Sequence, residues 1–378
     1  MHTKFDDIRP YFDSEFPEAM KRVSESEYFP ALAKFVFPNI EVEEAKKIAR
    51  NYSNIYDFQM DAMYRFNEQV IERTIDKFTY SGLNKLDPSK AYLFVSNHRD
   101  IVMDSSLLQY ILVCNGFRTT DITFGSNLMS SPLIIDLGRS NKMFKVMRGE
   151  TPREFYKTSL HLSQYIRHAI IDRNESVWIA QRNGRTKDGN DTTDQGIIKM
   201  FCMSGDKDQS KALNDLNIVP VSISYQYEPC DFFKTRELYL SRNGAKYNKE
   251  KDEDLISVLT GIKQYKGNVN ISVCDTIDTR LIDYSISNNN LFYKQAANLI
   301  NQYIFSNYKL YNTNYIAHDL RSKSNTYTER YTAESKEKFM EIHDKILDKF
   351  DTDKDIISNI FLDIYANSVD NVEMCSKK

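Results

Sequence analysis

The residues best suited to chemistry lie together behind one apolar run of the chain. His98 comes shortly after residues 91–96 (AYLFVS), and Asp100 and Asp104 follow it within six positions. A neutral imidazole is the usual general base near neutral pH, and a carboxylate on its other nitrogen fixes its tautomer and stabilises the imidazolium that forms. The spacing therefore predicts a catalytic histidine with an acidic partner. A histidine that only hydrogen-bonds its own turn is the alternative.

The segment around His98 predicts a buried strand, a polar turn and a helix. Residues 91–96 are of strand-forming type, and residues 107–113 form an apolar run that stops at Asn115-Gly116. In α/β proteins such turns lie at the carboxyl ends of the strands, where reactive groups gather. None of the other five histidines has this setting: His2, His161, His168, His318 and His343.

Three arginines follow other predicted strands. Arg148 comes after one strand, and Arg182 and Arg185 come after the next strand along the chain. In a parallel sheet these strand ends meet at the edge that carries His98, where an arginine fork suits a phosphate or a carboxylate. Arginines in loops are also commonly solvated surface residues, so both interpretations stay open.

Residues 181–194 (QRNGRTKDGNDTTD) form a polar loop that holds two of these arginines. Gly184 and Gly189 would let the backbone approach a ligand closely. The loop is not a phosphate-binding P-loop, because Asn190 and Asp191 stand where that motif needs Lys and Ser or Thr. A mobile surface loop is the alternative interpretation.

Composition limits the classes of function. The chain has 378 residues and a net charge of −3, which leaves no basic excess for nucleic acid. Its five cysteines are scattered and form no C-x-x-C pair, which suits a reducing compartment and argues against disulfides or a cysteine zinc site. The first residues do not form a signal peptide, and no apolar run is long enough to span a membrane. We therefore expect a cytoplasmic protein that contacts a membrane only peripherally.

The middle of the chain alternates between predicted strands and helices. A capping box, Thr151-Pro152-Arg153-Glu154, predicts the start of a helix over residues 152–171. Strand, helix, strand and helix in this order predict an α/β fold with a largely parallel sheet flanked by helices. The predicted strands are residues 78–82, 91–96, 121–125, 143–147, 176–180 and 218–227, with a further helix at 196–203; residues 131–137 are ambiguous.

Helical regions are expected at both ends. We predict a helical N-terminal region (1–77), an α/β domain (78–280) and a helical C-terminal region (281–378). The N-terminal region would cap the main domain; a lid or a membrane-facing surface is the alternative. Further predictions are helices at 41–51, 56–78, 252–266, 291–305, 333–350 and 355–365, edge strands at 238–240 and 269–273, and a loop at 306–331.

Four segments together resemble the glycerolipid acyltransferases, which transfer fatty acyl groups to glycerol phosphate or lysophosphatidate. That family has a His-Asp block after a strand, a block ending in Arg, a Glu-Gly-x-Arg block and a Pro within a strand. The matching segments are SNHRDIVMDSSLL (96–108), MFKVMRG (143–149), WIAQRNGRTKDG (178–189) and IVPVSISYQYEP (218–229). The resemblance covers about residues 78–229.

The sequence departs from the family pattern in two places. The family has four residues between His and Asp, whereas five separate His98 from Asp104. One residue turns a helical side chain by about 100°, so the extra residue must be absorbed in the turn before the helix. Asp104 is favoured over Asp100 as the partner, because the apolar helix resumes behind Asp104. Asn183 stands where the family has Glu, and Arg185 then falls one position early.

The resemblance implies transfer of a fatty acyl group from acyl-CoA or acyl carrier protein to a hydroxyl of a glycerol-phosphate or lysophospholipid-type acceptor. It implies His98 as general base, Asp104 as its orienting partner, and Arg148 and Arg185 as ligands of the acceptor's phosphate. Arg182 and Gly184 belong to the same substrate-binding block. The donor would lie in an apolar groove, backbone N–H groups would stabilise the oxyanion, and the thioester co-substrate would be needed without a further cofactor.

Other classes fit less well. His98-Arg99-Asp100 also begins the catalytic loop of protein kinases, but Ser105 stands where that loop needs Asn, and neither D-F-G nor G-x-G-x-x-G occurs. A dinuclear metal phosphoesterase would need several more ligands. An acyltransferase-like domain that binds lipid or protein without turnover remains open, because the His-Asp spacing is altered and the Glu is missing.

Overall fold

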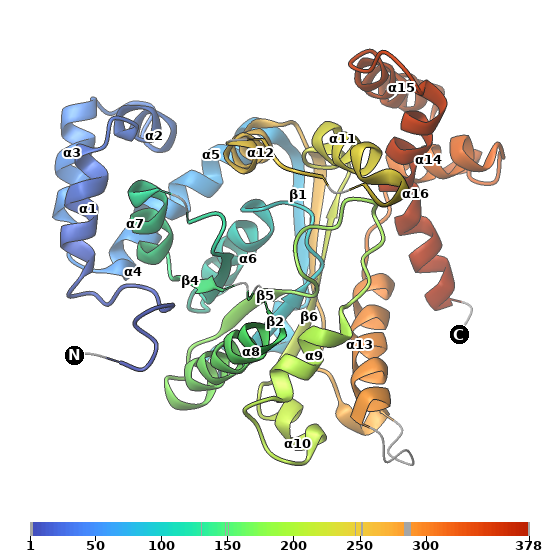
Figure 1. The fold of residues 1–378 in the computed structure, drawn as a ribbon. Helices are drawn as coiled ribbons and strands as arrows, with labels where there is room; N and C mark the ends of the chain where they lie inside the picture. The colour runs from blue at the N-terminus through green and yellow to red at the C-terminus, as the bar shows by residue number, and fades with distance from the viewer. Residues whose placement is uncertain are drawn as a thin grey trace.

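A seven-stranded sheet forms the centre of the protein (Figure 1). The computed structural model describes residues 3–129, 131–147, 149, 151–245, 247–250, 252–282 and 289–376. The strand order is β1-β7-β6-β2-β5-β3-β4, and every neighbouring pair is parallel except β6 and β7. The predicted α/β class with a largely parallel sheet is confirmed. The strands are β1 (Ile75–Ser81), β2 (Leu93–Ser96), β3 (Asp121–Gly125), β4 (Met143–Val146), β5 (Val177–Ala180), β6 (Ile218–Tyr225) and β7 (Gly267–Val273).

Five of the strands end at the same edge of the sheet. Strands β2 to β6 run in one direction, and β1 and β7 run in the opposite direction. We call the edge where β2 to β6 end the carboxyl edge. Ser96, the last residue of β2, pairs with Ala180 at the end of β5 and with Val221 of β6. The segments after β2 and β5 therefore leave the sheet side by side. Strand β6 continues for four more residues, to Tyr225.

Both faces of the sheet are covered by helices, because successive residues of a strand point to opposite faces. Leu93 and Val95 pack into one apolar core, and Phe94 packs into the other. The first core is completed by α8 (Pro152–Arg167), α9 (Gln195–Cys202), α10 (Gln209–Asn214) and α13 (Asn289–Ser306), and the second by α5 (Tyr64–Thr74), α6 (Met103–Cys114) and α7 (Pro132–Ser140).

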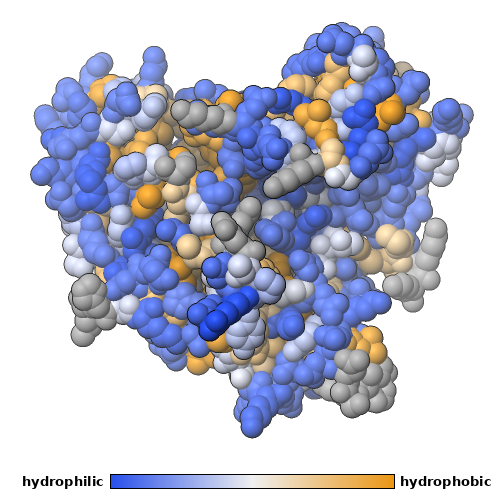
Figure 2. Space-filling view, in the orientation of Figure 1, coloured by the Kyte–Doolittle hydropathy of each residue, from blue (hydrophilic) through white to orange (hydrophobic). Residues whose placement is uncertain are grey.

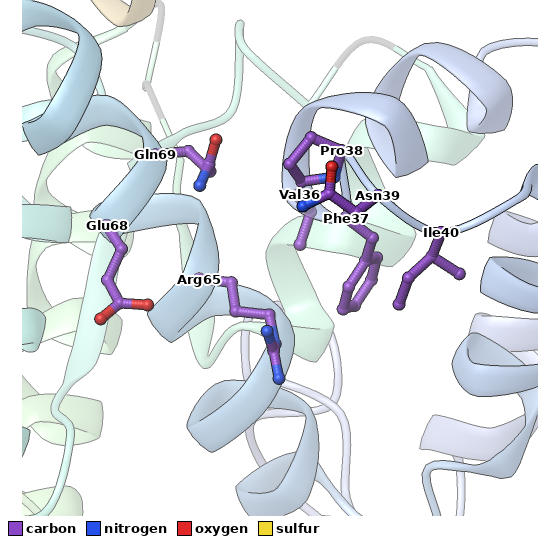
Figure 3. Close-up of a pocket in the computed structure, with 8 residues that line it drawn as sticks. All are labelled: Val36, Phe37, Pro38, Asn39, Ile40, Arg65, Glu68 and Gln69. Atoms are coloured by element: carbon purple, nitrogen blue, oxygen red, sulfur yellow. The ribbon is translucent and has the colours of Figure 1, made fainter.

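The N-terminal helices form a core of their own. Phe16 and Phe58 meet there, with ring centroids 5.6 Å apart. A hollow of about 170 Å³ lies between this region and α5. Its lining residues, drawn in Figure 3, are Val36, Phe37, Pro38, Asn39, Ile40, Arg65, Glu68 and Gln69. None of these residues belongs to the His98 turn. The helices are α1 (Phe16–Glu25), α2 (Phe29–Val36), α3 (Val42–Asn51) and α4 (Ile55–Phe58), followed by a π-helical turn (Gln59–Met63).

The C-terminal helices gather on the other side of the sheet (Figure 1), where Phe339, Phe361 and Tyr365 form another core. None of the described helices is both long and apolar enough to span a membrane. The face shown in Figure 2 is mostly hydrophilic, with hydrophobic residues in small groups. The remaining elements are α11 (Asp231–Ser241), α12 (Glu253–Lys263), α14 (Asn312–Ser322), α15 (Ala333–Leu347), α16 (Lys354–Ser376), a π-helical turn (His168–Asp172) and 3₁₀ turns at Leu83–Lys85, Arg242–Gly244, Thr279–Leu281 and Thr328–Arg330.

Three predictions after β6 are wrong. Residues 238–240, predicted as a strand, belong to helix α11, which packs against α16. Strand β7 is not at an edge, because β1 pairs with its outer side. The predicted loop at 306–331 contains α14, whose Ile316 and Ala317 are fully buried against the C-terminal helices. In each segment the contacts with distant elements override a weak local pattern.

Two boundaries also differ from the predictions, and the structure assigns one ambiguous segment. The helix predicted to reach residue 78 ends at Thr74, because the chain then extends and pairs with β7. The ambiguous segment 131–137 lies in helix α7, where the Ser131 hydroxyl accepts a hydrogen bond from the Ile134 N–H. Helix α16 continues to Ser376, well beyond the predicted residue 365.

Candidate active site

His98 contacts Asp104 across the turn that joins β2 to α6. The distance from His98 Nδ1 to Asp104 Oδ2 is 2.8 Å. The Asp104 side chain is fully buried, while that of His98 is 13% exposed. The pair therefore has its acidic end in the protein interior and its imidazole at the carboxyl edge.

Asp104 accepts four hydrogen bonds, which determine the tautomer of His98. Its Oδ2 also accepts from the backbone N–H groups of Arg99 (2.6 Å) and Asp100 (2.9 Å), and its Oδ1 accepts from the Tyr225 hydroxyl (2.7 Å). Backbone N–H groups can only donate, so the carboxylate acts as the acceptor. The proton of a neutral His98 therefore sits on Nδ1, and the lone pair on Nε2 is left for a substrate proton.

Asp100 has a different task in the same turn. Its Oδ1 accepts hydrogen bonds from the N–H groups of Val102 (2.9 Å) and Met103 (2.8 Å), the first groups of helix α6. Its Oδ2 is buried without a hydrogen-bond partner. The Asp100 side chain therefore supports the start of α6, whereas the partner of His98 is Asp104.

The imidazole is also held by the neighbouring strand β5. The ring of Trp178 meets His98 edge-on, with ring centroids 5.6 Å apart. The Trp178 Nε1–H donates to Ser96 Oγ at 3.0 Å, which ties the indole to the end of β2. Contact with Trp178 and the bond to Asp104 together limit the rotation of His98.

A buried network of charged side chains contacts the turn between β2 and α6. The Arg99 guanidinium contacts Asp191 at 2.6 Å and Glu228 at 3.2 Å, and the Lys234 ammonium donates to the Arg99 carbonyl at 2.7 Å. Burial by itself would lower the pKa of Arg99, but the carboxylates of Asp191 and Glu228 outweigh burial and hold that pKa well above its ordinary value. Lys234 also pairs with Glu228, so two cations and two anions balance.

Arg185 lies beside the His98 turn. The N–H of its neighbour Thr186 donates to the His98 carbonyl at 2.7 Å. Arg185 Nη1 is buried and has no hydrogen-bond partner. Burial raises the pKa of the nearby Cys230 thiol to about 11, and the positive charge of Arg185 acts against that rise. The charge of Arg185 therefore lies near Cys230, in the loop whose Thr186 N–H contacts the His98 carbonyl.

The other predicted site residues are less directly placed. Arg182 Nη1 donates to the Asn190 carbonyl at 3.4 Å and so closes its own loop. Gly184 is exposed with φ +75°, and a side chain there would meet nothing within 4 Å. Arg148 lies outside the described residues. The structure thus joins His98 to Asp104 and puts Arg185 beside their turn, with Arg182 and Gly184 in the same loop.

Sequence reasoning missed Tyr225 and Asp191. Tyr225 ends a series of alternate buried positions in β6, after Val221 and Ile223, on the face that packs against α6. A buried tyrosine hydroxyl needs a hydrogen-bond partner. The tyrosine at the end of this apolar series was therefore the signal in the sequence that a polar group lies nearby. Asp191 lies in a loop whose polar composition does not distinguish a buried acid from exposed ones.

The structure offers no arrangement for a metal ion within the part of the chain that it describes. No group of three or more His, Cys, Asp or Glu side chains is placed to bind one there.

Comparisons with known proteins show similarity to solved structures alone. No family model matches the sequence, and no curated protein matches it. The crystal structure of the 1-acyl-sn-glycerophosphate (LPA) acyltransferase PlsC from Thermotoga maritima has a TM-score of 0.40 and 11% sequence identity to this chain. The similarity covers 76% of this chain and 92% of that chain. A similarity at this level assigns no function to this chain.

Proposed function

We propose that this protein is an acyltransferase that moves a fatty acyl group from a thioester donor to a hydroxyl group. The donor is acyl-CoA or acyl carrier protein, and the acceptor is a glycerol-phosphate or lysophospholipid-type molecule. The observation that carries the proposal is the His98–Asp104 pair, because the buried carboxylate holds Nδ1–H and directs Nε2 to the carboxyl edge. The four segments that resemble glycerolipid acyltransferases support this choice of chemistry.

The reaction on this proposal is a direct transfer. His98 Nε2 removes the proton of the acceptor hydroxyl while the acceptor oxygen bonds to the thioester carbonyl carbon. The tetrahedral intermediate then expels the thiolate, which takes the proton from the His98 imidazolium. The products are an ester and a free thiol. No acyl-enzyme forms, and no cofactor beyond the thioester is needed.

Arg185 is the group we propose for the acceptor's phosphate. Two observations support this role: Arg185 Nη1 has no hydrogen-bond partner, and the N–H of the next residue, Thr186, donates to the His98 carbonyl. Arg182 and Gly184 would shape the same loop around the phosphate, and Arg148 stays a prediction.

Helix α12 supports a lipid substrate. It lies against the His98 turn, where a side chain at Gly261 would come within 2.0 Å of Asp100 Oδ2. Glu253 and Ser257 on this inner side are buried, whereas Leu255, Ile256 and Leu259 are 44–47% exposed. The outer side of α12 thus carries three large apolar residues that no other element covers in the described structure. An apolar surface beside the site suits fatty acyl chains, and it is our basis for proposing peripheral contact with a membrane.

A thiol-release assay tests the proposal. Purified protein is given acyl-CoA or acyl carrier protein donors with a panel of hydroxylated acceptors. His98→Ala should lower turnover by about 10²–10⁴-fold, as expected for loss of a general base. His168→Ala is the matched control, because His168 Nδ1 also lies 2.8 Å from a carboxylate, that of Asp172, on the surface. Wild-type turnover in His98→Ala would remove His98 from the mechanism.

The same assay tests the acceptor. Arg185→Lys keeps the charge and loses the guanidinium fork, so the KM for a phosphate-bearing acceptor should rise about tenfold while the KM of the donor barely moves. An unchanged acceptor KM would argue for an acceptor without a phosphate.

The second candidate function is an acyltransferase-like domain that binds lipid or protein without turnover. The five residues between His98 and Asp104, and Asn183 in place of the family's Glu, favour it. Lipid binding without thiol release from any donor would support this function over catalysis.

A further inference from the structure

Tyr225 is connected to the candidate base through a buried carboxylate. Its hydroxyl donates to Asp104 Oδ1 at 2.7 Å, and Asp104 Oδ2 contacts His98 Nδ1 at 2.8 Å. Tyr225 is 1% exposed and Asp104 is fully buried, so water does not compete for either bond. Burial and the charge of Asp104 raise the pKa of Tyr225 well above its ordinary value, which keeps the phenol a donor throughout the working pH range.

We propose that Tyr225 is a positioning residue that sets the basicity of His98 by sharing the negative charge of Asp104. The inference rests on the proposed function in treating His98 as the base. A carboxylate that accepts a strong hydrogen bond on one oxygen attracts a proton on the imidazole less strongly. Without the phenol, more of the carboxylate charge faces His98, and the imidazolium becomes more stable. Tyr225 would thus limit how strongly Asp104 stabilises the imidazolium of His98.

Other charged groups near the pair are held by partners of their own. Arg99 is engaged by Asp191 and Glu228, and Lys234 by Glu228. Within the described residues, two side chains hydrogen-bond Asp104: those of His98 and Tyr225. Several charged or titratable groups surround this turn. They come from the segments after β2, β5 and β6, from α11 and from the segment before β7. They are Arg99, Asp100, Arg185, Asp191, Glu228, Cys230, Lys234 and Lys266.

The test is an NMR titration of the His98 imidazole in the full chain, with the resonance assigned by its loss in His98→Gln. Tyr225→Phe should raise the pKa of His98 by about 0.5–1 unit, since the carboxylate loses one of its donors. Site-specific 3-fluorotyrosine at position 225 is a stronger donor and should lower the same pKa. A higher His98 pKa in Tyr225→Phe together with a lower one in the fluorotyrosine protein supports the proposal. An unchanged His98 pKa in both proteins overturns it.

Tyr165→Phe is the matched control. Tyr165 is also 1% exposed and donates to a buried carboxylate, Asp121 Oδ2, at 2.7 Å. Asp121 begins β3, so this pair lies at the opposite edge of the sheet from His98. Tyr165→Phe should leave the His98 pKa unchanged; an equal shift there would show a general effect of lost stability and overturn the role of Tyr225.

Turnover gives a second measurement. The acidic limb of the pH profile of kcat/KM should move to higher pH in Tyr225→Phe by the same amount as the NMR pKa, and KM should change little. If the wild-type protein releases no thiol, the proposed function fails, while the NMR shifts still decide the coupling of Tyr225 to His98. An NMR shift without movement of the acidic limb in an active enzyme would overturn the functional role.

Discussion

Asp100 and Asp104 make different contacts at the start of α6, and mutation can separate their roles. Asp104 accepts from His98, whereas Asp100 accepts from the first N–H groups of α6. Asp104→Asn removes the negative charge that stabilises the imidazolium, so we expect turnover to fall by roughly 10²-fold or more. Asp100→Asn keeps an oxygen that can cap α6 and should retain most activity. Thiol release measures both variants, and the reverse order would assign the partnership to Asp100.

Lys266 makes the stability of the protein depend on pH. Its side chain is fully buried and donates to the Gln264 carbonyl at 2.7 Å. Burial lowers its pKa from 10.5 to about 8, although the charge of Asp100 opposes this. The unfolded chain therefore binds more protons than the folded chain between these pH values, so the contribution of Lys266 to stability rises from pH 8 to pH 10.5 and is lost as the pH falls through 8.

The comparison with Lys266→Met isolates this effect. Relative to the variant, the wild-type free energy of unfolding should increase by roughly 3 kcal/mol between pH 7 and pH 10.5, since each pKa unit corresponds to about 1.4 kcal/mol. Urea unfolding across this pH range measures the difference. A constant difference would mean that Lys266 has an ordinary pKa in the folded protein.

At the scale of elements, α12 depends on a glycine to approach the His98 turn. A Cβ at Gly261 would lie 2.0 Å from Asp100 Oδ2 and 2.9 Å from its Cγ. Alanine normally favours a helix, but here the helix or the carboxylate must move. We expect Gly261→Ala to destabilise the protein by about 1–3 kcal/mol, as in other overpacked sites.

Gly138→Ala is the control for this effect. Gly138 is buried in helix α7, and a Cβ there would meet its nearest atom, Met143 Sδ, at 3.4 Å, an ordinary contact. Helix propensity alone should make this variant neutral or more stable by up to about 1 kcal/mol. Similar destabilisation of both variants in urea unfolding would mean that the contact of α12 with Asp100 is not what matters.

At the scale of the whole molecule, the C-terminal helix α16 contacts the loop of residues 181–194, which carries Arg185. Asn367 Nδ2 donates to the Asp188 carbonyl at 2.7 Å, and Ser368 Oγ accepts from Arg99 at 3.0 Å. A Cβ at Gly189 would lie 2.2 Å from the Ile364 carbonyl, so loop and helix are in close contact. A helix more than 150 residues away in sequence thus supports the candidate site.

Replacing both polar anchors should loosen this loop. In Asn367→Ala/Ser368→Ala we expect faster hydrogen exchange at the Thr186 amide, which donates to the His98 carbonyl, and turnover lower by about tenfold, the effect of losing roughly 1.4 kcal/mol. Asn359→Ala, on the exposed side of α16, is the control. Unchanged exchange and turnover in the double variant would show that α16 supports the fold but not the site.

The sequence alone determined those features that depend on neighbours in the chain. The strand at 121–125 is an apolar run with polar ends, and the capping box at Thr151 is complete within four residues. His98 and Asp104 are also close in sequence, so their contact could be predicted, with Asp104 favoured over Asp100 because the apolar helix resumes behind it. Local patterns of this kind need no information about the rest of the fold.

The tertiary structure decided everything that depends on distant partners. Tyr225 is 121 positions from Asp104, and Arg99 is 92 positions from Asp191; both contacts exist only because β6 and the β5 loop lie beside β2. The polar segment containing α14 becomes a helix because α16 covers its few apolar residues. The free energy of such contacts comes from burial among elements that the chain brings together only on folding, and no local pattern encodes that arrangement.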